Sequence, residues 1–287
     1  MSELDKNEIY LGKKVGITGV YDPSFLRRIL RSEERDKVGI KKPLPFVGTD
    51  VWGCYEFSFL TWNNLPKNYL LKIVYDSSSP YIVESKSLKI YLGNFSMTQF
   101  SKEIEDICLL IESDLSKLLE TEVKVYHYKM DIERKVLLNI WSELDSKISK
   151  NLVFSDFKRN PSLLEKGSEE EYSIYSDSLK SNCRFTGAPD YGTISIYMKG
   201  ENLPTFDSLL KYIVSFRGEN HFHEEICETV YFDLKERFSL SDLYVCTQYL
   251  RRGGIDINVV RTSSDKLLKT LREDFLGEEM FLRTERQ

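Results

Sequence analysis

Residues Thr193–Met198 read TISIYM and open the stretch of sequence that decides the fold class. Polar and apolar residues alternate at its start, which is typical of a half-buried strand. Two helical patterns follow, over Thr205–Phe216 and Glu224–Arg237. Two further strand patterns then cover Leu243–Leu250 and Ile255–Val260. Tyr172–Leu179 is a further strand pattern that comes before Thr193. The order of strands, then helices, then strands predicts an α+β fold.

The first half of the chain has a similar order of elements. Val51–Leu60 is dense in aromatic residues and Tyr69–Tyr75 alternates, so both are predicted strands. Apolar residues recur at three- and four-residue steps over Thr98–Glu120, which predicts an amphipathic helix. Glu122–Lys129 alternates again as a strand. The two halves repeat the order of elements without a residue-by-residue repeat, which favours two similar α+β modules.

We expect these modules at residues 1–150 and 151–287. Their junction falls in a less regular stretch, about 131–171. Within it, Val136–Ile148 is predicted to be helical, and Glu165–Glu171 is a charged run that we expect to be exposed.

Composition and charge restrict the classes of protein that this chain can belong to. Of its 287 residues, 41% are hydrophobic and 30% charged, as in ordinary globular proteins. No apolar run reaches the roughly 20 residues of a membrane helix, and we expect the polar N-terminus not to be a signal peptide. The net charge of −5 argues against direct nucleic-acid binding, which calls for a basic face.

The five cysteines are widely spaced and include no C-x-x-C pair. This pattern disfavours both a disulfide framework and a zinc site, and it indicates the reducing cytoplasm. One thiol can still be kept for its reactivity. For the other four we expect the role of small buried hydrophobic residues: Cys54, Cys108, Cys227 and Cys246.

Four segments carry polar residues that core patterning does not explain. They are Glu84–Lys89 (ESKSLK), Ser181–Gly192 (SNCRFTGAPDYG), Phe222–Glu224 (FHE) and Arg251–Asn258 (RRGGIDIN). Each alone is weak, because ESKSLK would most often be a solvated loop and RRGG a turn. Together and in this order, they resemble the NADPH-dependent 7-cyano-7-deazaguanine reductases, in the longer, two-module form of that family. The resemblance extends through Leu44-Pro45-Phe46, Asp50-Val51-Trp52 and Tyr55–Ser58, and covers most of the chain outside 131–171 and the C-terminal tail.

The resemblance implies a particular architecture and a metabolic role. The fold would be tandem tunnelling-fold modules, each an antiparallel four-stranded sheet with two helices on one face, with active sites at module junctions. A homodimer is the expected assembly. The family reduces the nitrile of 7-cyano-7-deazaguanine to an aminomethyl group in queuosine biosynthesis, so its product later serves transfer RNA modification. That link implies no RNA-binding surface here.

A nitrile carbon is a poor hydride acceptor, and covalent catalysis replaces one difficult reduction with easier successive steps. A thiolate adds to the carbon, the resulting thioimidate takes one hydride, and the imine that is then released takes a second. The resemblance implies that Cys183 is this nucleophile and that Asp190 protonates the nitrile nitrogen. Gly187, Pro189 and Gly192 make a tight loop plausible between Cys183 and Asp190. His223 resembles the family histidine near the reacting carbon and can assist proton transfer.

The base needs acceptors for its N–H groups, and carboxylates supply them. The substrate-binding residues implied by the resemblance are Val83, Glu84, Ser85, His223 and Glu224. The chain has no Gly-x-Gly-x-x-Gly after a strand, so NADPH must be held without a Rossmann domain. The resemblance points to Ser85, Lys86, Arg252 and Gly253, because cations and exposed backbone N–H groups suit phosphates.

The sequence departs from the family pattern at three places and leaves rival functions open. Ala188 and Tyr191 stand where the family usually has glutamine and tryptophan, and Glu219-Asn220-His221 precedes Phe222-His223-Glu224, where the family tends to read His-Asn-Glu. Another purine or pterin enzyme of the same fold is one rival, but its metal-dependent members need clustered ligands, and His221 with His223 is a thin basis for them. We expect no metal, and we expect His221 to be a surface or loop residue. The second rival is a catalytically inactive deazapurine-binding protein, which would need neither Cys183 nor Asp190.

Overall fold

Two long strands from distant parts of the sequence pair at the centre of the fold. Strand β12 (Ile255–Thr262) runs antiparallel to β2 (Val47–Thr61), with Ile255 opposite Cys54 and Thr262 opposite Val47. This pairing joins both halves of the chain into one ten-stranded sheet whose main order is β10-β8-β9-β11-β12-β2-β3-β6. The computed structural model describes residues 9–10, 12, 16–129 and 141–269, and within them the fold is mixed α+β.

The remaining strands differ greatly in length. Long antiparallel strands build most of the sheet, and shorter ones add to its edges. The longer strands are β3 (Pro66–Asp76), β6 (Val123–Tyr128), β8 (Glu171–Cys183), β9 (Pro189–Glu201) and β11 (Ser239–Tyr249). The short ones are β5 (Gln99–Phe100), β7 (Ser142–Glu143) and β10 (Asn220–His221), while β1 (Arg28–Leu30) and β4 (Tyr81–Val83) form a separate two-stranded sheet.

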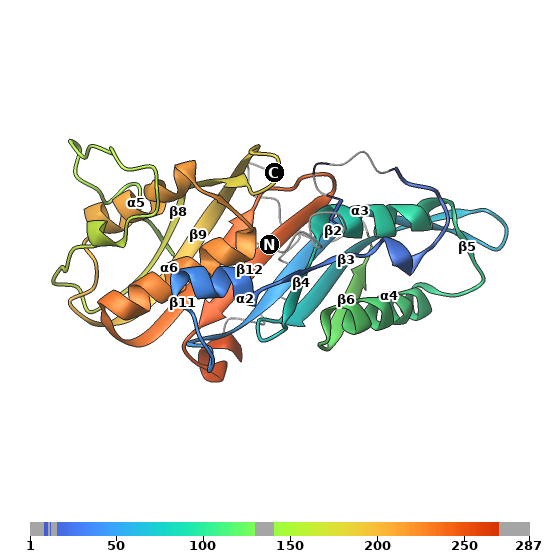
Figure 1. The fold of residues 1–287 in the computed structure, drawn as a ribbon, viewed down its shortest axis with the longest axis horizontal. Helices are drawn as coiled ribbons and strands as arrows, with labels where there is room; N and C mark the ends of the chain where they lie inside the picture. Colours follow the sequence, from blue (N-terminus) through green and yellow to red (C-terminus); the bar gives the residue numbers. More distant parts are fainter. Residues whose placement is uncertain (1–8, 11, 13–15, 130–140, 270–287) are drawn as a thin grey trace.

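The helices lie over the sheet as a second layer. In Figure 1, α5 and α6 lie over the strands of the second half, and α3 and α4 over those of the first. Residues of these four helices and of the strands below them share one buried apolar core. The helices are α2 (Ser32–Val38), α3 (Ser85–Asn94), α4 (Ile104–Leu119), α5 (Phe206–Ser215) and α6 (His223–Arg237), with short 3-10 turns at Pro23–Phe25, Phe95–Met97, Pro161–Leu163 and Phe216–Gly218.

Most predicted elements are confirmed, because their apolar periodicity matches the face that packing buries. In α4, for example, Ile107, Ile111 and Leu115 are fully buried at four-residue steps. The helix begins at Ile104 rather than at the predicted Thr98. Residues 98–100 have other partners: the Thr98 hydroxyl accepts a hydrogen bond from the Tyr21 N–H, and Gln99–Phe100 pairs with β2.

The ESKSLK segment, which taken alone would most often be a solvated loop, forms the cap and the start of α3. One further expectation about local structure was wrong. The predicted helix Val136–Ile148 is not helical over 141–148, and residues 136–140 lie outside the described part. Ser142–Glu143 adds to the edge of β8 as β7, and the Leu144 N–H donates to the Tyr175 carbonyl. Sheet hydrogen bonds to a distant strand thus override a local helical pattern. The charged run Glu165–Glu171 is largely exposed, as expected.

The two halves contribute unequally to the sheet. The second half supplies four long antiparallel strands, β8, β9, β11 and β12, together with α5 and α6. Among the described residues, the first half supplies three, β2, β3 and β6, together with α3 and α4. None of the helices in the described ranges combines the length and apolar character needed to cross a membrane.

Candidate active site

A cavity of ≈ 400 Å³ opens near the seam between β2 and β12. Its wall includes the start of α3, the β8–β9 hairpin, the start of α6 and the turn between β11 and β12. Eight of the ten residues singled out in the sequence line it: Val83, Ser85, Lys86, Cys183, Asp190, His223, Glu224 and Arg252. The other two, Glu84 and Gly253, are sequence neighbours of lining residues but are not part of the wall.

A tight hairpin brings Cys183 and Asp190 to this cavity. The Cys183 N–H donates to the Ala188 carbonyl at 2.8 Å, and the Cys183 carbonyl accepts from the Gly187 N–H at 2.9 Å. Gly187 has φ +66°, a conformation that residues with a side chain rarely adopt. Asp190 then pairs with Ser181 at the start of β9. The expected tight loop is therefore confirmed, and Cys183 is partly exposed while the other four cysteines are buried.

Asp190 is held by two cationic or potentially cationic groups. Its Oδ1 accepts from Arg252 Nη1 at 2.9 Å, and its Oδ2 lies 3.5 Å from His223 Nε2. Burial acts to raise the pKa of Asp190, but the His223 and Arg252 interactions outweigh burial, so its pKa is lowered from the ordinary value. The carboxylate is consequently ionised at neutral pH.

His223 lies flat against a buried tyrosine. Its ring centroid is 3.7 Å from that of Tyr249, and the two planes differ by 5°. The backbone of β9 makes room for this tyrosine at Gly192, where a Cβ atom would lie 2.8 Å from the Gln248 carbonyl and 3.2 Å from the Tyr249 ring. The Nδ1 atom of His223 is buried and has no hydrogen-bond partner among the described residues. Stacking and the Asp190 contact therefore fix the orientation of the imidazole ring.

Glu224 faces the same cavity from the first turn of α6 and is only 3% exposed. Burial raises the pKa of Glu224 to about 8; Asp50 adds to the rise, while Arg31 and Arg261 oppose it. Its Oε1 is buried without a hydrogen-bond partner among the described residues. Because burial raises the pKa of Glu224 to about 8, its carboxyl group is largely protonated at neutral pH.

Glu84 is placed differently from the expectation of a cavity-facing carboxylate. It is 0% exposed, and its Oε2 accepts a hydrogen bond from the Ser87 N–H at 2.6 Å, which caps the start of α3. The cap directs α3 so that its first residues, Ser85 and Lys86, line the cavity. Sequence rules predict Ser, Thr, Asp or Asn at the N-cap of a helix, so they would not identify Glu84 as a cap. The only signal is that Glu84 lies immediately before a segment with helical spacing.

Several cationic side chains line the cavity. Lys86, Lys89 and Arg252 all line it. Burial and the neighbouring Arg252 lower the pKa of Lys89, whereas Glu84, Asp190 and Cys183 act to raise it. Gly253 has φ +60°, and a Cβ atom there would lie 3.4 Å from the Lys89 side chain. No role for Lys89 was predicted from the sequence. Residues four apart lie on the same face of a helix, so a helix that begins at Ser85 would have placed Lys89 beside Ser85.

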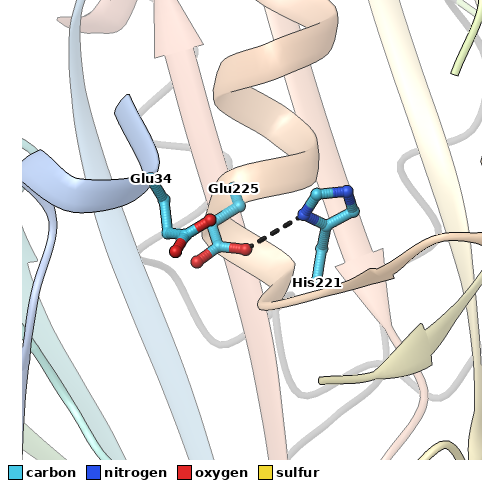
Figure 2. A group of neighbouring side chains, drawn as sticks. All are labelled: Glu34, His221 and Glu225. Carbon is cyan, nitrogen blue, oxygen red and sulfur yellow. Dashed lines mark hydrogen bonds and ion pairs between the residues drawn. The ribbon is translucent and has the colours of Figure 1, made fainter. Parts of the chain in front are cut away.

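A second group of charged residues lies beside the cavity. Figure 2 shows Glu34, His221 and Glu225, whose ligand atoms lie within 4.8 Å of one another. Arg184 forms ion pairs with both glutamates, and Lys37 forms another with Glu34. Side-chain cations thus already neutralise these carboxylates, as expected of an ion-pair network. His221 was expected to be a surface or loop residue, but it lies in β10, its side chain is 23% exposed and it lines the cavity.

The sequence matches two protein-family models. Residues 18–127 match the model described as "Nitrile reductase, 7-cyano-7-deazaguanine-reductase N-term". Residues 189–267 match the model described as "QueF-like protein". An NADPH-dependent 7-cyano-7-deazaguanine reductase of Hydrogenovibrio crunogenus is 35% identical over 91% of this chain and 94% of its own length. The chain belongs to this family.

Other relatives agree with the assignment. An NADPH-dependent 7-cyano-7-deazaguanine reductase of Desulfotalea psychrophila is also 35% identical, over 95% of this chain and 99% of its own length. Among solved structures, an archaeosine synthase QueF-Like in the apo form aligns with 34% of this chain and 96% of its own, at 18% identity and a TM-score of 0.31. A score this low supports no conclusion about the fold.

The matched segments contain most of the cavity wall. The first includes Val83, Ser85 and Lys86, and the second includes His223 and Arg252. Cys183 lies between the two segments, six residues before the second begins. Its assignment as nucleophile therefore depends on its flanking residues and on its place in the cavity.

Proposed function

We propose that this chain reduces the nitrile of 7-cyano-7-deazaguanine to the aminomethyl group of 7-aminomethyl-7-deazaguanine, with NADPH as hydride donor. The observation that carries the proposal is the cavity in which Cys183, Asp190, His223 and Glu224 meet. It offers a thiol, a proton carrier and an acceptor for a base in one space. Family membership supports the same reaction, because relatives bear that name over nearly their whole length.

In the proposed mechanism the Cys183 sulfur adds to the nitrile carbon and the nitrile nitrogen takes up a proton, giving a thioimidate. Asp190 delivers that proton. Because Asp190 is ionised in this site, the proton must first reach it from the Cys183 thiol or from His223, whose Nε2 lies 3.5 Å away. NADPH would supply the hydrides that reduce the thioimidate and then the imine. Cys183 is released when the tetrahedral adduct collapses to the imine.

We assign binding of the base to Val83, Glu84, Ser85, His223 and Glu224. Glu224 would accept N–H hydrogen bonds of the base from the start of α6, and Val83 and Ser85 would offer backbone groups from the opposite wall. Glu84 would act with them, although it also caps α3. The carboxyl groups thus come from both halves of the chain.

For NADPH we assign Ser85, Lys86, Arg252 and Gly253. The cavity residues fit a phosphate-bearing cofactor because Lys86 and Arg252, with Lys89 beside them, supply positive charge. The start of α3 adds backbone N–H groups, which favour anions. The positive φ of Gly253 lets the chain approach closely without a side chain.

We further propose that the modules divide at residues 1–150 and 151–287 as tandem tunnelling-fold units and that the chain acts as a homodimer in queuosine biosynthesis, upstream of transfer RNA modification. The four antiparallel strands and two helices of the second half support the first of these statements. Five unpaired cysteines fit a reducing compartment such as the cytoplasm. No RNA surface is assigned.

Loss of NADPH absorbance after addition of 7-cyano-7-deazaguanine tests the reaction, with the product identified by mass. We expect two NADPH consumed per nitrile, because reduction of a nitrile to an amine takes two hydrides. Binding of the base without NADPH oxidation would overturn the proposal and favour a catalytically inactive deazapurine-binding protein. Turnover that depends on a bound metal ion would favour another purine or pterin enzyme.

A further inference from the structure

Glu225, the neighbour of Glu224, uses both of its oxygens to join separate parts of the structure. Its Oε2 accepts from the Phe222 N–H at 3.0 Å, which caps α6, and lies 3.1 Å from His221 Nδ1. Its Oε1 accepts from Arg184 Nη1 at 2.9 Å. The side chain is only 11% exposed, so water screens these interactions weakly.

Arg184 directly follows Cys183 and is held from two sides. One terminal nitrogen contacts Glu225 on α6, and the other pairs with Glu34 on α2, a helix of the first half. The guanidinium lies 5.5 Å from the centre of the Phe222 ring. Figure 2 shows Glu34 and Glu225 converging from their two helices.

The backbone reinforces the same connection. His221 pairs with Cys183 in the short parallel contact of β10 with β8, and the Asn182 N–H donates to the Glu219 carbonyl at 2.8 Å. These contacts fix the end of β8 beside the segment that leads into α6. The Arg184–Glu225 ion pair adds a side-chain contact to α6 just after Cys183.

We propose that Glu225 and Arg184 are positioning residues, which together hold the Cys183 sulfur in place relative to the α6 residues His223 and Glu224. The inference rests on the proposed function, because it assumes that the sulfur attacks a base held by α6. Arg184 reaches two carboxylates through its planar fork, a geometry that lysine cannot reproduce. Misplacement of a reacting group by about 1 Å can cost about 100-fold in rate.

The test compares full-length variants at two steps of the reaction. Steady-state NADPH oxidation separates kcat from the KM for 7-cyano-7-deazaguanine. Mass spectrometry without NADPH follows formation of the covalent Cys183 adduct. The variants are Glu225→Gln, Arg184→Gln, the double variant and Arg184→Lys. Glu236→Gln is the matched control, because Glu236 is an exposed residue of the same helix.

We expect Glu225→Gln and Arg184→Gln each to lower kcat and the rate of adduct formation about 10- to 100-fold, with KM changed less than about threefold. The double variant should lose less than the product of the two single losses, because both single variants already remove the Arg184–Glu225 contact. Arg184→Lys should recover only part of the rate. Glu236→Gln should match the wild type.

Adduct formation at the wild-type rate in both single variants would overturn the inference. So would a raised KM with unchanged kcat, which would make these residues part of base binding. If Glu225→Gln fails to fold because α6 loses its cap, Arg184→Gln tests the proposal by itself, because it leaves that cap in place. Absence of adduct and turnover in the wild type would instead overturn the proposed function itself.

Discussion

Among the five cysteines, Cys183 combines partial exposure with a place in the cavity wall. It ends β8 at a hairpin whose backbone bonds bring Asp190 back to the same cavity. Asp190 is in turn held by Arg252 and His223. Cys183 and Asp190 thus come from one hairpin. The partners of Asp190 come from two other places: His223 from the start of α6 and Arg252 from the turn between β11 and β12.

Replacement of the thiol tests the nucleophile. We expect Cys183→Ala to lose turnover and the covalent adduct, because Cys183 is the only cysteine among the described residues that line the cavity, while affinity for the base stays within about threefold. Calorimetry measures the affinity, and NADPH absorbance the turnover. Cys108→Ala, at a buried position on α4, is the control and should retain turnover. Substantial nitrile reduction by Cys183→Ala would contradict the covalent mechanism.

The protonation state of Glu224 makes binding of the base depend on pH. Its pKa is raised to about 8, so the accepting carboxylate becomes more abundant as pH rises through that value. In a Cys183→Ala background, affinity for the base should increase about tenfold between pH 7 and pH 8.5. Calorimetry at each pH measures it. In Glu224→Gln the affinity should be lower and nearly independent of pH, and an equal pH slope in both proteins would rule out this role.

Helices at the site begin with caps that direct side chains into the cavity. Glu84 caps α3 and Glu225 caps α6, and the residues next to these caps, Ser85 and Glu224, line the cavity. In α5, by contrast, Thr205 caps a helix away from the cavity, where its hydroxyl accepts from the Ser208 N–H at 3.2 Å. The effect of a cap on stability can therefore be measured there without disturbing the site.

We expect Thr205→Ala to lower the free energy of unfolding by about 1 kcal/mol, because one N–H at the start of α5 loses its partner. Urea unfolding followed by circular dichroism measures the change. Thr205→Ser keeps a hydroxyl acceptor and serves as the control. kcat should be unchanged in both variants, and a large loss of kcat in Thr205→Ala would mean that α5 influences the cavity.

A buried ion network connects the two halves of the molecule at the β2–β12 seam. Arg261 on β12 is 0% exposed and donates to Asp50 on β2 at 2.8 Å and to Glu228 on α6 at 2.7 Å. Arg35 of α2 also donates to Glu228, at 2.7 and 2.8 Å. These charges are costly to bury unless paired, so the network is satisfied only when both halves are folded together.

Removal of one cation from this network should destabilise the whole molecule. We expect Arg261→Met to lower the free energy of unfolding by about 3–5 kcal/mol, because Asp50 and Glu228 lose a buried partner. Arg28→Met is the control, since its pair with Glu120 is exposed and should contribute less than about 1 kcal/mol. Urea unfolding measures both. A change in Arg261→Met no larger than the control would contradict a structural role for the network.

Most strands and the three helices with clear apolar periodicity were predictable, because the alternation of buried and exposed residues is local information. The ten residues singled out in the sequence likewise include eight that line one cavity. Less was predictable where a segment's partner lies far away in sequence. Residues 98–100 and 142–144 pair with distant strands, and the start of α3 depends on the buried carboxylate of Glu84.

By itself, then, the sequence determined the fold class, the order of elements and the residues with the chemistry for a nitrile reductase, because periodicity and short motifs lie within a few residues of one another. Only the tertiary structure decided that β12 pairs with β2, that His223 stacks on Tyr249 and that Arg184 reaches both Glu34 and Glu225. Such contacts, and the raised pKa that burial gives Glu224, depend on which surfaces pack together once the chain has folded.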